Sequence, residues 1–315
     1  MQLADSIVYA DGRFLRYDEV QVGLLTHGLN YGTGCFEGIR GYWNPRENEL
    51  YLLHLREHYA RLKTSARIMM MTLPHTLDDL VEITVELCAR NRYEQHLYIR
   101  PLLFKGTEDV GVRLAGLEDR FAIAALPFSR YFDASAGLHT GVSSWRRIDD
   151  TMAPARAKIT GAYVNSALAK SEALQNGFDE AILLSMDGHV SEGSAANLFL
   201  VRDGMLFTPD PTQNVLEGIT RRAVLTLAKD ELGVPVVERS LDRSELYGAD
   251  ELFLTGTAAG ISFVASVDHR PIGDGTMGPL TRKLAALYER IVLGEIPAYR
   301  SWVTPTYAGR TVPAA

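Results

Sequence analysis

The chain has 315 residues, of which 46% are hydrophobic and 23% are charged, and its formal net charge is −7 at pH 7. This composition is typical of a folded globular protein of one or two domains and excludes a disordered chain. The negative charge argues against nucleic-acid binding as the main function, because proteins with that function usually carry a basic excess.

The sequence shows no signal for secretion, membrane insertion or disulfide formation. The first residues, MQLADSIVYADG, lack the basic start and the apolar run of a signal peptide, and no apolar stretch approaches membrane-spanning length. Two cysteines, Cys35 and Cys88, cannot form a disulfide framework. We therefore expect a cytoplasmic, soluble protein with neither membrane nor nucleic acid as a partner.

In chain order, the first predicted element is a hairpin at residues 6–15, where the pair Asp11–Gly12 splits two apolar runs. Both residue types tolerate the positive φ angles of tight hairpin turns. Helical periodicity follows at residues 54–70 and 76–91, and strand-like segments lie at 96–104 and 120–128. Residues 127–137, PFSRYFDASAG, combine proline with polar and small residues and predict an interdomain connection.

The second half of the chain mixes hairpins and helices in the same way. Helical periodicity at residues 161–177, 218–233 and 278–294 alternates with strand-like segments at 181–186, 197–201 and 251–256. Two further hairpin turns are predicted at Asp187–Gly188 and Asp203–Gly204, and the last two helices close with Gly233 and Gly294. This mixture indicates an α+β fold rather than a strictly alternating parallel sheet.

Two side chains between Met152 and Phe199 carry the most chemical information. Lys158 lies in APARAKITGAY, and Glu192 lies in the turn-rich segment VSEGSAANLF. A lysine can capture the aldehyde of pyridoxal phosphate as an imine, and a carboxylate can keep the pyridine nitrogen protonated. The chain has only six lysines, and the sequence context favours Lys158 over the other five. The six are Lys63, Lys105, Lys158, Lys170, Lys229 and Lys283.

Two segments could bind the phosphate of such a cofactor. LEGITRRAV places Gly218, Ile219 and Thr220 at the start of a predicted helix, where unpaired N–H groups and the helix dipole favour an anion. FLTGTAAGIS places Thr255, Gly256 and Thr257 at the end of a strand, before small residues that allow a close backbone approach. Either segment alone could be an ordinary helix cap or glycine turn. Together they favour a phosphorylated cofactor.

Arginines and aromatic residues supply further candidates. Arg56 and Arg61 share one predicted helix, and a guanidinium suits phosphate, but periodicity does not choose between them. Five glycines in residues 26–42 indicate a backbone that passes close to something flat or small, or a glycine-rich strand with a bulge. Tyr98 and Arg100 are two residues apart, so on a strand they face one side, where they could bind a carboxylate or simply face solvent.

Several other chemistries lack support in the sequence. The histidines are scattered, and no paired Cys or His spacing suggests a metal site. The P-loop pattern of nucleotide-binding proteins and the GxSxG pattern of serine hydrolases are absent. We therefore expect no metal.

Seven segments, in this order and spacing, give the chain its resemblance to a known family. They are HGLNYGTGCFEGIRGY, HYARL, YIRPLLF, AKITGAYVNS, VSEGSAANLF, LEGITRRAV and TGTAAGI. Together they resemble the fold-type IV pyridoxal phosphate enzymes, most closely the bacterial branched-chain amino-acid aminotransferases. The resemblance implies a two-domain fold like that of the D-amino-acid aminotransferases. A small N-terminal α/β domain would span residues 1–127, a loop 128–137, and a larger β-rich domain with helices 138–315.

The resemblance also implies roles for individual residues. Lys158 would be the catalytic lysine that holds pyridoxal 5′-phosphate and carries the proton. The residues implied to bind the cofactor are Arg61, Lys158, Tyr163, Glu192, Ile219, Thr220, Gly256 and Thr257. The residues implied to surround the substrate are Tyr31, Phe36, Arg40, Tyr98, Arg100, Val110, Val112, Phe128, Tyr131 and Ala258. Val110 and Val112 would reach into the site of a partner subunit, which implies a homodimer or a larger homo-oligomer.

The implied reaction is transamination of L-leucine, L-isoleucine and L-valine with 2-oxoglutarate, which yields branched-chain 2-oxo acids and L-glutamate by ping-pong kinetics. Two departures from many bacterial relatives, Ala196 and Gly260 in place of glutamates, leave the substrate preference open. The alternatives are a D-amino-acid or (R)-amine transaminase, an aminodeoxychorismate lyase, and a noncatalytic binding protein. The segment YIRPLLF favours the branched-chain reading over the first of these.

Overall fold

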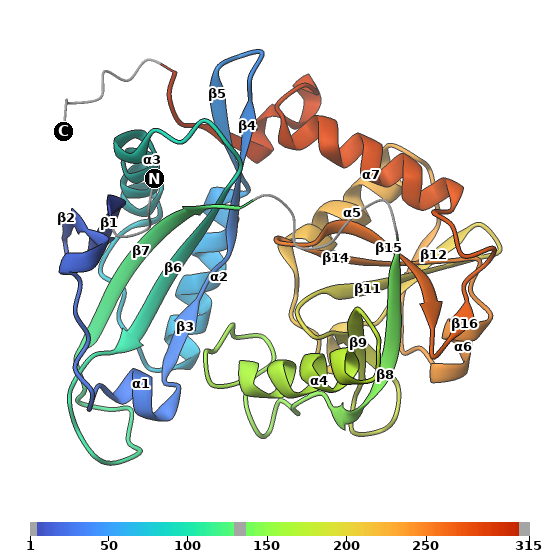
Figure 1. Ribbon diagram of the computed structural model, residues 1–315, viewed down its shortest axis with the longest axis horizontal. Helices are drawn as coiled ribbons and strands as arrows, with labels where there is room; N and C mark the ends of the chain where they lie inside the picture. The colour runs from blue at the N-terminus through green and yellow to red at the C-terminus, as the bar shows by residue number, and fades with distance from the viewer. Residues whose placement is uncertain (1–4, 129–136, 309–315) are drawn as a thin grey trace. The chain divides into compact units, whose positions relative to one another are not determined.

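A computed structural model describes residues 5–128 and 137–308 of the chain (Figure 1). Contacts between Cα positions divide the chain into two compact units. Unit 1 comprises residues 1–129, 157–161 and 289–315, and unit 2 comprises residues 130–156 and 162–288. The predicted division into 1–127 and 138–315 therefore differs at two segments, 157–161 and 289–315, which group with unit 1. Most of the predicted loop 128–137 lies outside the described residues.

The elements of unit 1 alternate short strands with helices. They are β1 Ile7–Ala10, β2 Arg13–Arg16, η2 Tyr17–Glu19, α1 His27–Tyr31, β3 Gly34–Phe36, β4 Ile39–Asn44, β5 Glu49–Leu53, α2 Leu55–Ile68, α3 Leu77–Asn91, β6 Leu97–Lys105, β7 Asp119–Pro127, η4 Pro297–Trp302 and β17 Val303–Pro305. The strands form an antiparallel sheet in the order β17-β5-β4-β6-β7-β1-β2, and β3 pairs with the other end of β6.

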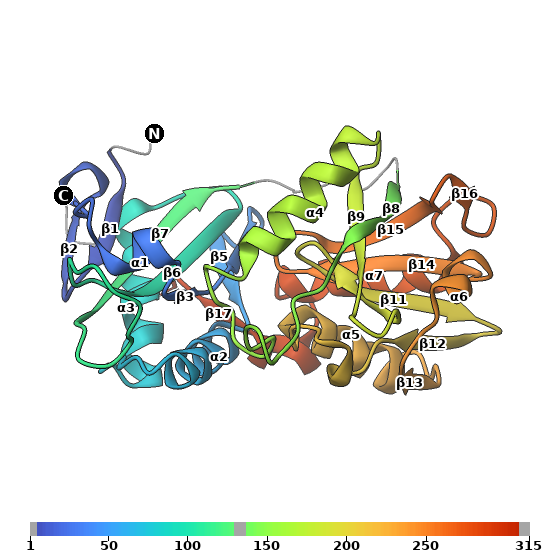
Figure 2. The ribbon, with the colours of Figure 1, turned by 90° about the horizontal axis from the view of Figure 1, so that it is seen from below.

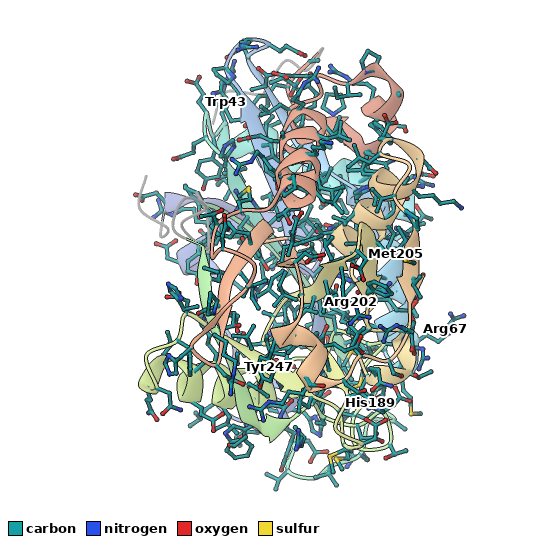
Figure 3. All side chains as sticks on the ribbon, turned by 90° about the vertical axis from the view of Figure 1, so that its right-hand side faces the viewer. Trp43, Arg67, His189, Arg202, Met205 and Tyr247 are labelled. Carbon is teal, nitrogen blue, oxygen red and sulfur yellow. The ribbon has the colours of Figure 1, made fainter. Side chains whose placement is uncertain are left out.

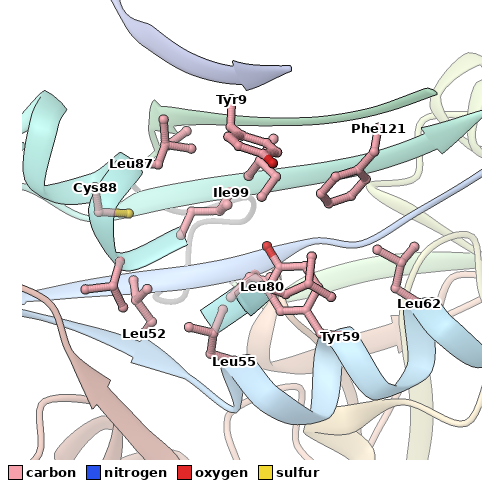
Figure 4. Packing of buried hydrophobic residues seen from close by; sticks show 14 of the residues in the cluster. Tyr9, Leu52, Leu55, Tyr59, Leu62, Leu80, Leu87, Cys88, Ile99 and Phe121 are labelled. Atoms are coloured by element: carbon pink, nitrogen blue, oxygen red, sulfur yellow. The ribbon is translucent and has the colours of Figure 1, made fainter. Parts of the chain in front are cut away.

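Helices α2 and α3 pack against this sheet and against each other, on the side seen below the strands in Figure 2. The apolar face of α2 buries Leu55, Tyr59 and Leu62, which point toward the strands and lie in one cluster with Ile99 of β6 (Figure 4). The predicted helices at 54–70 and 76–91 are confirmed, because the 3.6-residue spacing of their apolar side chains matches one buried face. The core of unit 1 is therefore this sheet–helix interface.

Unit 2 contains the remaining elements. They are β8 Leu138–Arg146, α4 Tyr163–Gln175, β9 Glu180–Leu184, β10 Val190–Gly193, β11 Asn197–Arg202, β12 Met205–Thr208, η3 Pro211–Gln213, α5 Ile219–Asp230, β13 Val236–Glu238, α6 Arg243–Tyr247, β14 Glu251–Gly256, β15 Gly260–Val267 and β16 Arg270–Pro271. The strand order is β10-β9-β8-β15-β14-β11-β12-β13, and β16 pairs with β15. Helix α7, Pro279–Val292, begins in unit 2 and ends in unit 1.

The strands of unit 2 separate α4, which packs on β8 and β9, from α5, which packs on β13 and β14 (Figure 2). All three predicted Asp-Gly hairpins of the chain are confirmed. In one of them Arg202 and Met205, labelled in Figure 3, are register partners on either side of the turn, where Asp203 and Gly204 have φ of 50° and 72°. Within the described ranges, every helix is too short or too polar to cross a bilayer.

Candidate functional site

One face of the sheet in unit 1 carries four of the ten predicted substrate residues. Strand β6 pairs with β4 in the register Arg40↔Tyr98 and with β3 in the register Phe36↔Leu102. Side chains alternate along a strand, and directly paired residues share a face. The predicted residues on this face are Phe36, Arg40, Tyr98 and Arg100. The predicted same-sided arrangement of Tyr98 and Arg100 is therefore confirmed.

These side chains contact one another through rings and guanidinium groups. The Cζ atom of Arg100 lies 4.6 Å from the Phe36 ring centroid, and its Nη2 donates to the Tyr98 hydroxyl at 3.2 Å. Arg40 is buried, and its Cζ lies 4.9 Å from the centroid of the Phe128 ring. Cations held among aromatic rings make a face that can bind an anionic group beside an apolar one.

Lys158 lies at the same face. Its Nζ is 4.8 Å from the Phe36 ring centroid. Its backbone is fixed on both sides, because its carbonyl accepts from the Phe36 N–H at 3.0 Å and its own N–H donates to Ser65 Oγ at 3.1 Å. The lysine thus stands on a backbone held by β3 and by α2.

The glycines of residues 26–42 make room for the segment that carries Lys158. Gly32 has a φ of 65°, and a Cβ atom there would lie 2.7 Å from the Cα of Gly161. Gly161 N–H donates to Gly32 O at 3.0 Å, and Thr160 N–H donates to Gly34 O at 2.9 Å. The close neighbour that the glycines predicted is therefore a second stretch of backbone. This pairing also explains why residues 157–161 group with unit 1.

Arg61 lies on α2 and pairs with a buried carboxylate. Its Nε and Nη2 donate to the two oxygens of Glu37 at 2.7 and 2.8 Å, and His58 Nδ1 lies 2.7 Å from Glu37 Oε2. The Arg61 side chain is 13% exposed, whereas Arg56 is 55% exposed and pairs with Asp78. Burial and a fixed geometry therefore distinguish Arg61 from Arg56, which periodicity could not do.

Glu37 is charged at any physiological pH. Burial raises the pKa of its carboxyl, but the charge and hydrogen bonds of Arg61, together with those of His58, outweigh burial and lower the pKa to about 2. Burial lowers the pKa of His58, although the neighbouring carboxylate opposes that shift. The pair of Glu37 and Arg61 therefore stays ionised, and the guanidinium is oriented by a carboxylate that does not titrate near neutral pH.

Tyr31, Val110 and Val112 form a second group in unit 1, at α1 and the loop 107–113. The Tyr31 hydroxyl accepts from the Gly111 N–H at 3.2 Å. The flanking Val110 and Val112 are 77% and 81% exposed, which is unusual for valine. Tyr131, which is also predicted for the substrate wall, lies outside the described residues.

In unit 2, Glu192 is buried on β10 and held by three donors. Arg147 Nη2 lies 2.9 Å from Oε1, while the Asn197 amide and the Leu216 N–H donate to Oε2 at 2.8 and 3.2 Å. Arg147 is itself buried, and its Nε donates to the Asn214 carbonyl at 3.2 Å. A carboxylate held by a cation and two amides is fixed in position.

The start of α5 lies beside this carboxylate. Gly218 is the N-cap of α5, and a Cβ atom there would lie 2.0 Å from Asn197 Oδ1, so only glycine fits. Ile219 and Thr220, which follow, are buried. Their N–H groups belong to the first helical turn, which has no intrahelical acceptor for them. The prediction of a helix start at this point is confirmed, and its neighbour is Asn197.

The turn 256–260 connects β14 to β15 in the same unit. Asn197 on β11 is the register partner of Thr255 on β14, so both side chains share a face. Gly256 is the register partner of Gly260, whose φ is 63°, and the intervening Thr257 and Ala258 are half-buried. Tyr163 is half-buried at the first position of α4. Its predicted role rests on the family resemblance.

Sequence reasoning missed the partners of the predicted residues. It did not single out Glu37 and His58, although both lie in segments that carry the family resemblance, and it did not single out Arg147, which lies in none of them. One signal was available for Glu37, which is a lone carboxylate in the otherwise apolar and glycine-rich GTGCFEGI. Within the described residues, no group of three or more His, Cys, Asp or Glu side chains could hold a metal ion.

Residues 34–267 match the family described as amino-transferase class IV. The chain belongs to the class IV aminotransferases. It is 47% identical over 299 residues to a probable branched-chain-amino-acid aminotransferase from Aquifex aeolicus, a match that covers 95% of this chain and 96% of that protein. The predicted aminotransferase family is therefore confirmed.

Solved structures of other class IV aminotransferases share the fold. The branched-chain aminotransferase of Thermoproteus uzoniensis, solved with norvaline, has a TM-score of 0.92 and 43% identity, and the match covers 96% of this chain and 99% of that one. The branched-chain amino acid aminotransferase of Thermobaculum terrenum, solved in its PLP form, has a TM-score of 0.92 and 38% identity, with 97% and 99% covered. The predicted fold-type IV, α+β architecture is confirmed.

Proposed function

We propose that this class IV aminotransferase uses pyridoxal 5′-phosphate to transaminate branched-chain L-amino acids, with 2-oxoglutarate as the amino acceptor. The observation that carries the proposal is the cluster of Lys158, Phe36 and Arg100 on one face of unit 1, since it joins an amine, an apolar ring and a cation. The names of the similar proteins from Aquifex, Thermoproteus and Thermobaculum support the same function.

The residues of unit 2 fit a cofactor with a basic ring nitrogen and a phosphate. Thr255 Oγ1 is buried and has no hydrogen-bond partner among the described residues. A polar group of a ligand could form the missing hydrogen bond and so offset the cost of burying this hydroxyl. Glu192 is a fixed carboxylate, and the α5 N-terminus and the 256–260 turn offer backbone donors. We infer that Glu192 holds the ring nitrogen. Ile219, Thr220, Gly256, Thr257 and Arg61 would hold the phosphate, and Tyr163 the phenolic oxygen.

When bound, pyridoxal phosphate supplies an aldehyde that captures amines and a pyridinium ring that accepts electron density. Lys158 Nζ would hold the cofactor before substrate arrives, and it would then remove the α-proton as a base and return a proton as an acid. Glu192 would keep the ring nitrogen protonated through a charge-assisted hydrogen bond. These two residues thus divide proton transfer and electrostatic stabilisation between them.

Substrate recognition follows from the charges of unit 1. A carboxylate buried without a partner is costly, so both carboxylates of 2-oxoglutarate need donors. Arg100 is exposed and already donates to Tyr98, which suits a second carboxylate, while Arg40, Tyr98 and the backbone at Thr257 and Ala258 would receive the α-carboxylate. An aliphatic side chain would then lie among Phe36, Phe128 and Tyr31.

We also propose a homodimer in the cytoplasm. The exposed Leu24, Leu29, Val110 and Val112 in unit 1 support a partner subunit, because large apolar side chains gathered on a surface are characteristic of interfaces. Cys35 and Cys88 are free and buried, which suits a reducing compartment. The molar mass of the protein, measured by light scattering after size-exclusion chromatography, would test the assembly. The mass of a monomer would contradict the proposed homodimer.

A panel of amino donors with 2-oxoglutarate tests the proposed reaction. L-leucine, L-isoleucine and L-valine should each give glutamate faster than L-aspartate and D-alanine. An apolar pocket discriminates poorly between aliphatic side chains that differ by one methylene, so the three rates should differ by at most about 200-fold. Faster turnover of D-alanine or (R)-1-phenylethylamine than of L-leucine would instead identify a D-amino-acid or amine transaminase, and pyruvate release without an acceptor would identify a lyase.

A further inference from the structure

His27 is a buried histidine whose two ring nitrogens both have partners. It is 0% exposed and is the first residue of α1. Its Nδ1 lies 2.6 Å from Thr33 Oγ1, and its Nε2 lies 2.7 Å from the carbonyl oxygen of Gly111, which is 84 residues away in the chain. The ring also packs on Tyr31, with centroids 4.6 Å apart. One side chain therefore links the glycine-rich segment, α1 and the loop 107–113.

The acceptor at Gly111 determines the tautomer of His27. A carbonyl oxygen can only accept, so Nε2 must carry the hydrogen. In the neutral ring Nδ1 then accepts, and the Thr33 hydroxyl donates to it. Both hydrogen bonds are satisfied at once by the neutral Nε2–H form. Because the ring is buried, the loss of either bond would leave an unpaired polar group.

Both backbone groups of Gly111 are used in this network. Its carbonyl accepts from His27, and its N–H donates to the Tyr31 hydroxyl. Gly111 has a φ of 154°, at the edge of the region that side chains other than glycine's rarely adopt. The base of the loop is bound separately, since the His27 N–H donates to Thr107 O at 3.0 Å. The loop is thus held at its base and at its tip.

We propose that His27 is a positioning residue that sets the affinity for the substrate side chain by fixing Gly111. The valines on either side of Gly111, Val110 and Val112, are largely exposed and make no anchoring contact of their own with a core. Fixing Gly111 therefore fixes where both valines project, and it fixes Tyr31 beside them. The inference rests on the proposed function and on the substrate contacts that the family resemblance implies for Tyr31, Val110 and Val112.

Two substitutions at His27 separate its two hydrogen bonds. In His27→Gln the amide nitrogen can replace Nε2–H and still reach the Gly111 carbonyl. In His27→Asn the shorter side chain reaches only the Thr33 position. With purified holoenzyme, His27→Asn should raise the KM for L-leucine about tenfold, the cost of roughly one lost buried hydrogen bond, while kcat changes less than about twofold. His27→Gln should recover most of the wild-type KM.

Hydrogen–deuterium exchange gives a readout that does not depend on activity. The 107–113 segment should exchange faster in His27→Asn than in wild type, and His27→Gln should restore its protection. His75→Gln is the matched control, because His75 bonds the Tyr9 hydroxyl at 2.9 Å elsewhere in unit 1, and it should change neither readout. If His27→Asn does not fold, Thr33→Val removes only the Nδ1 partner and should produce the same changes to a smaller extent.

Two outcomes would overturn the inference. One is an unchanged exchange rate of residues 107–113 in His27→Asn, and the other is a fall in kcat with KM unchanged. Failure of the proposed function looks different, since wild type itself would then not transaminate L-leucine. In that case the exchange comparison alone decides whether His27 anchors the loop.

Discussion

Each unit contains a buried glutamate paired with an arginine, but the two pairs are built differently. In unit 1, Arg61 binds both oxygens of Glu37 through Nε and Nη2 of one guanidinium, and His58 adds a third contact. Such a fork fixes the plane of the guanidinium relative to the carboxylate. Glu37 therefore acts on another side chain, and any ligand would be bound through Arg61.

In unit 2, Glu192 has donors from three separate segments, namely Arg147 before α4, Asn197 on β11 and the Leu216 N–H before α5. Arg147 contacts Oε1, whereas the Asn197 amide and the Leu216 N–H donate to Oε2. The position of this carboxylate therefore does not depend on one partner. A group that binds a ligand has to be held in place by its surroundings in this way. The comparison teaches that a buried glutamate–arginine pair can orient the arginine in one place and present the carboxylate in another.

The largest expected effect concerns the lysine of unit 1. Lys158→Ala should lower the rate of transamination of L-leucine by about 10⁴-fold or more, because it removes the group that moves the α-proton. It should also abolish the visible absorbance of the bound cofactor. The exposed Lys229 on α5 provides the control, and Lys229→Ala should keep both signals. Borohydride reduction that labels Lys170, or any lysine other than Lys158, would contradict the assignment.

The second prediction tests the contrast between the two glutamates directly. Glu192→Gln should lower kcat by about 10- to 100-fold while most of the cofactor is retained, since a charge-assisted hydrogen bond contributes about 1.5–3 kcal/mol. Glu37→Gln should do the opposite, with weaker cofactor retention and a smaller effect on kcat in the presence of excess cofactor. Equal losses of kcat in both variants, measured at saturating pyridoxal phosphate, would remove the distinction between the two sites.

The third prediction concerns the arginine that Glu37 orients. Arg61→Lys keeps a positive charge beside Glu37 but loses the fork, so it should weaken pyridoxal phosphate binding about tenfold with little loss of stability. Arg56→Lys on the same helix is the matched control and should change binding by less than about twofold, because exposed ion pairs contribute little. Dialysis followed by reconstitution measures both, and a larger effect at Arg56 would move the clamp to the other turn of α2.

Local features of the fold were accessible from the sequence, and most partnerships were not. The Asp-Gly turns, the amphipathic helices and the closing Gly233 and Gly294 depend on residues a few positions apart, and the structure confirms them. The glycine-rich segment 26–42 was harder, because α1, β3 and β4 share it and no periodicity extends over so few residues. A flat or small close neighbour was expected there, but not that this neighbour would be the backbone of the segment carrying Lys158.

The candidate site shows the same division. Lys158 and Glu192 lie in motifs that a reader of the sequence can recognise. The groups that hold them or their neighbours come from distant positions, such as Arg147, 45 residues before Glu192 (192 − 147 = 45). Pairings of this kind follow from tertiary packing, which sequence spacing does not encode. Residue roles taken from the family remain predictions for Tyr163, Thr257 and Ala258 in particular.

The smallest expected effect is the pH dependence of stability that Glu37 confers on unit 1. Its pKa in the folded protein is about 2, below the ordinary value of 4.5, because Arg61 and His58 favour the charged form more than burial disfavours it. In the unfolded chain, the Glu37 carboxylate therefore binds a proton below pH 4.5, whereas in the folded protein it binds one only at about pH 2. The contribution of Glu37 is complete above pH 4.5 and declines as the pH falls toward 2.

Thermal unfolding of the cofactor-free protein should show this decline as an unfolding midpoint that drops by about 3 °C or more between pH 4.5 and pH 2. In Glu37→Gln the midpoint should be lower at pH 7 but flatter with pH, whereas Glu82→Gln, an exposed change on α3, should leave the slope as in wild type. A slope in Glu37→Gln as steep as that of wild type would show that other carboxylates set the acid stability.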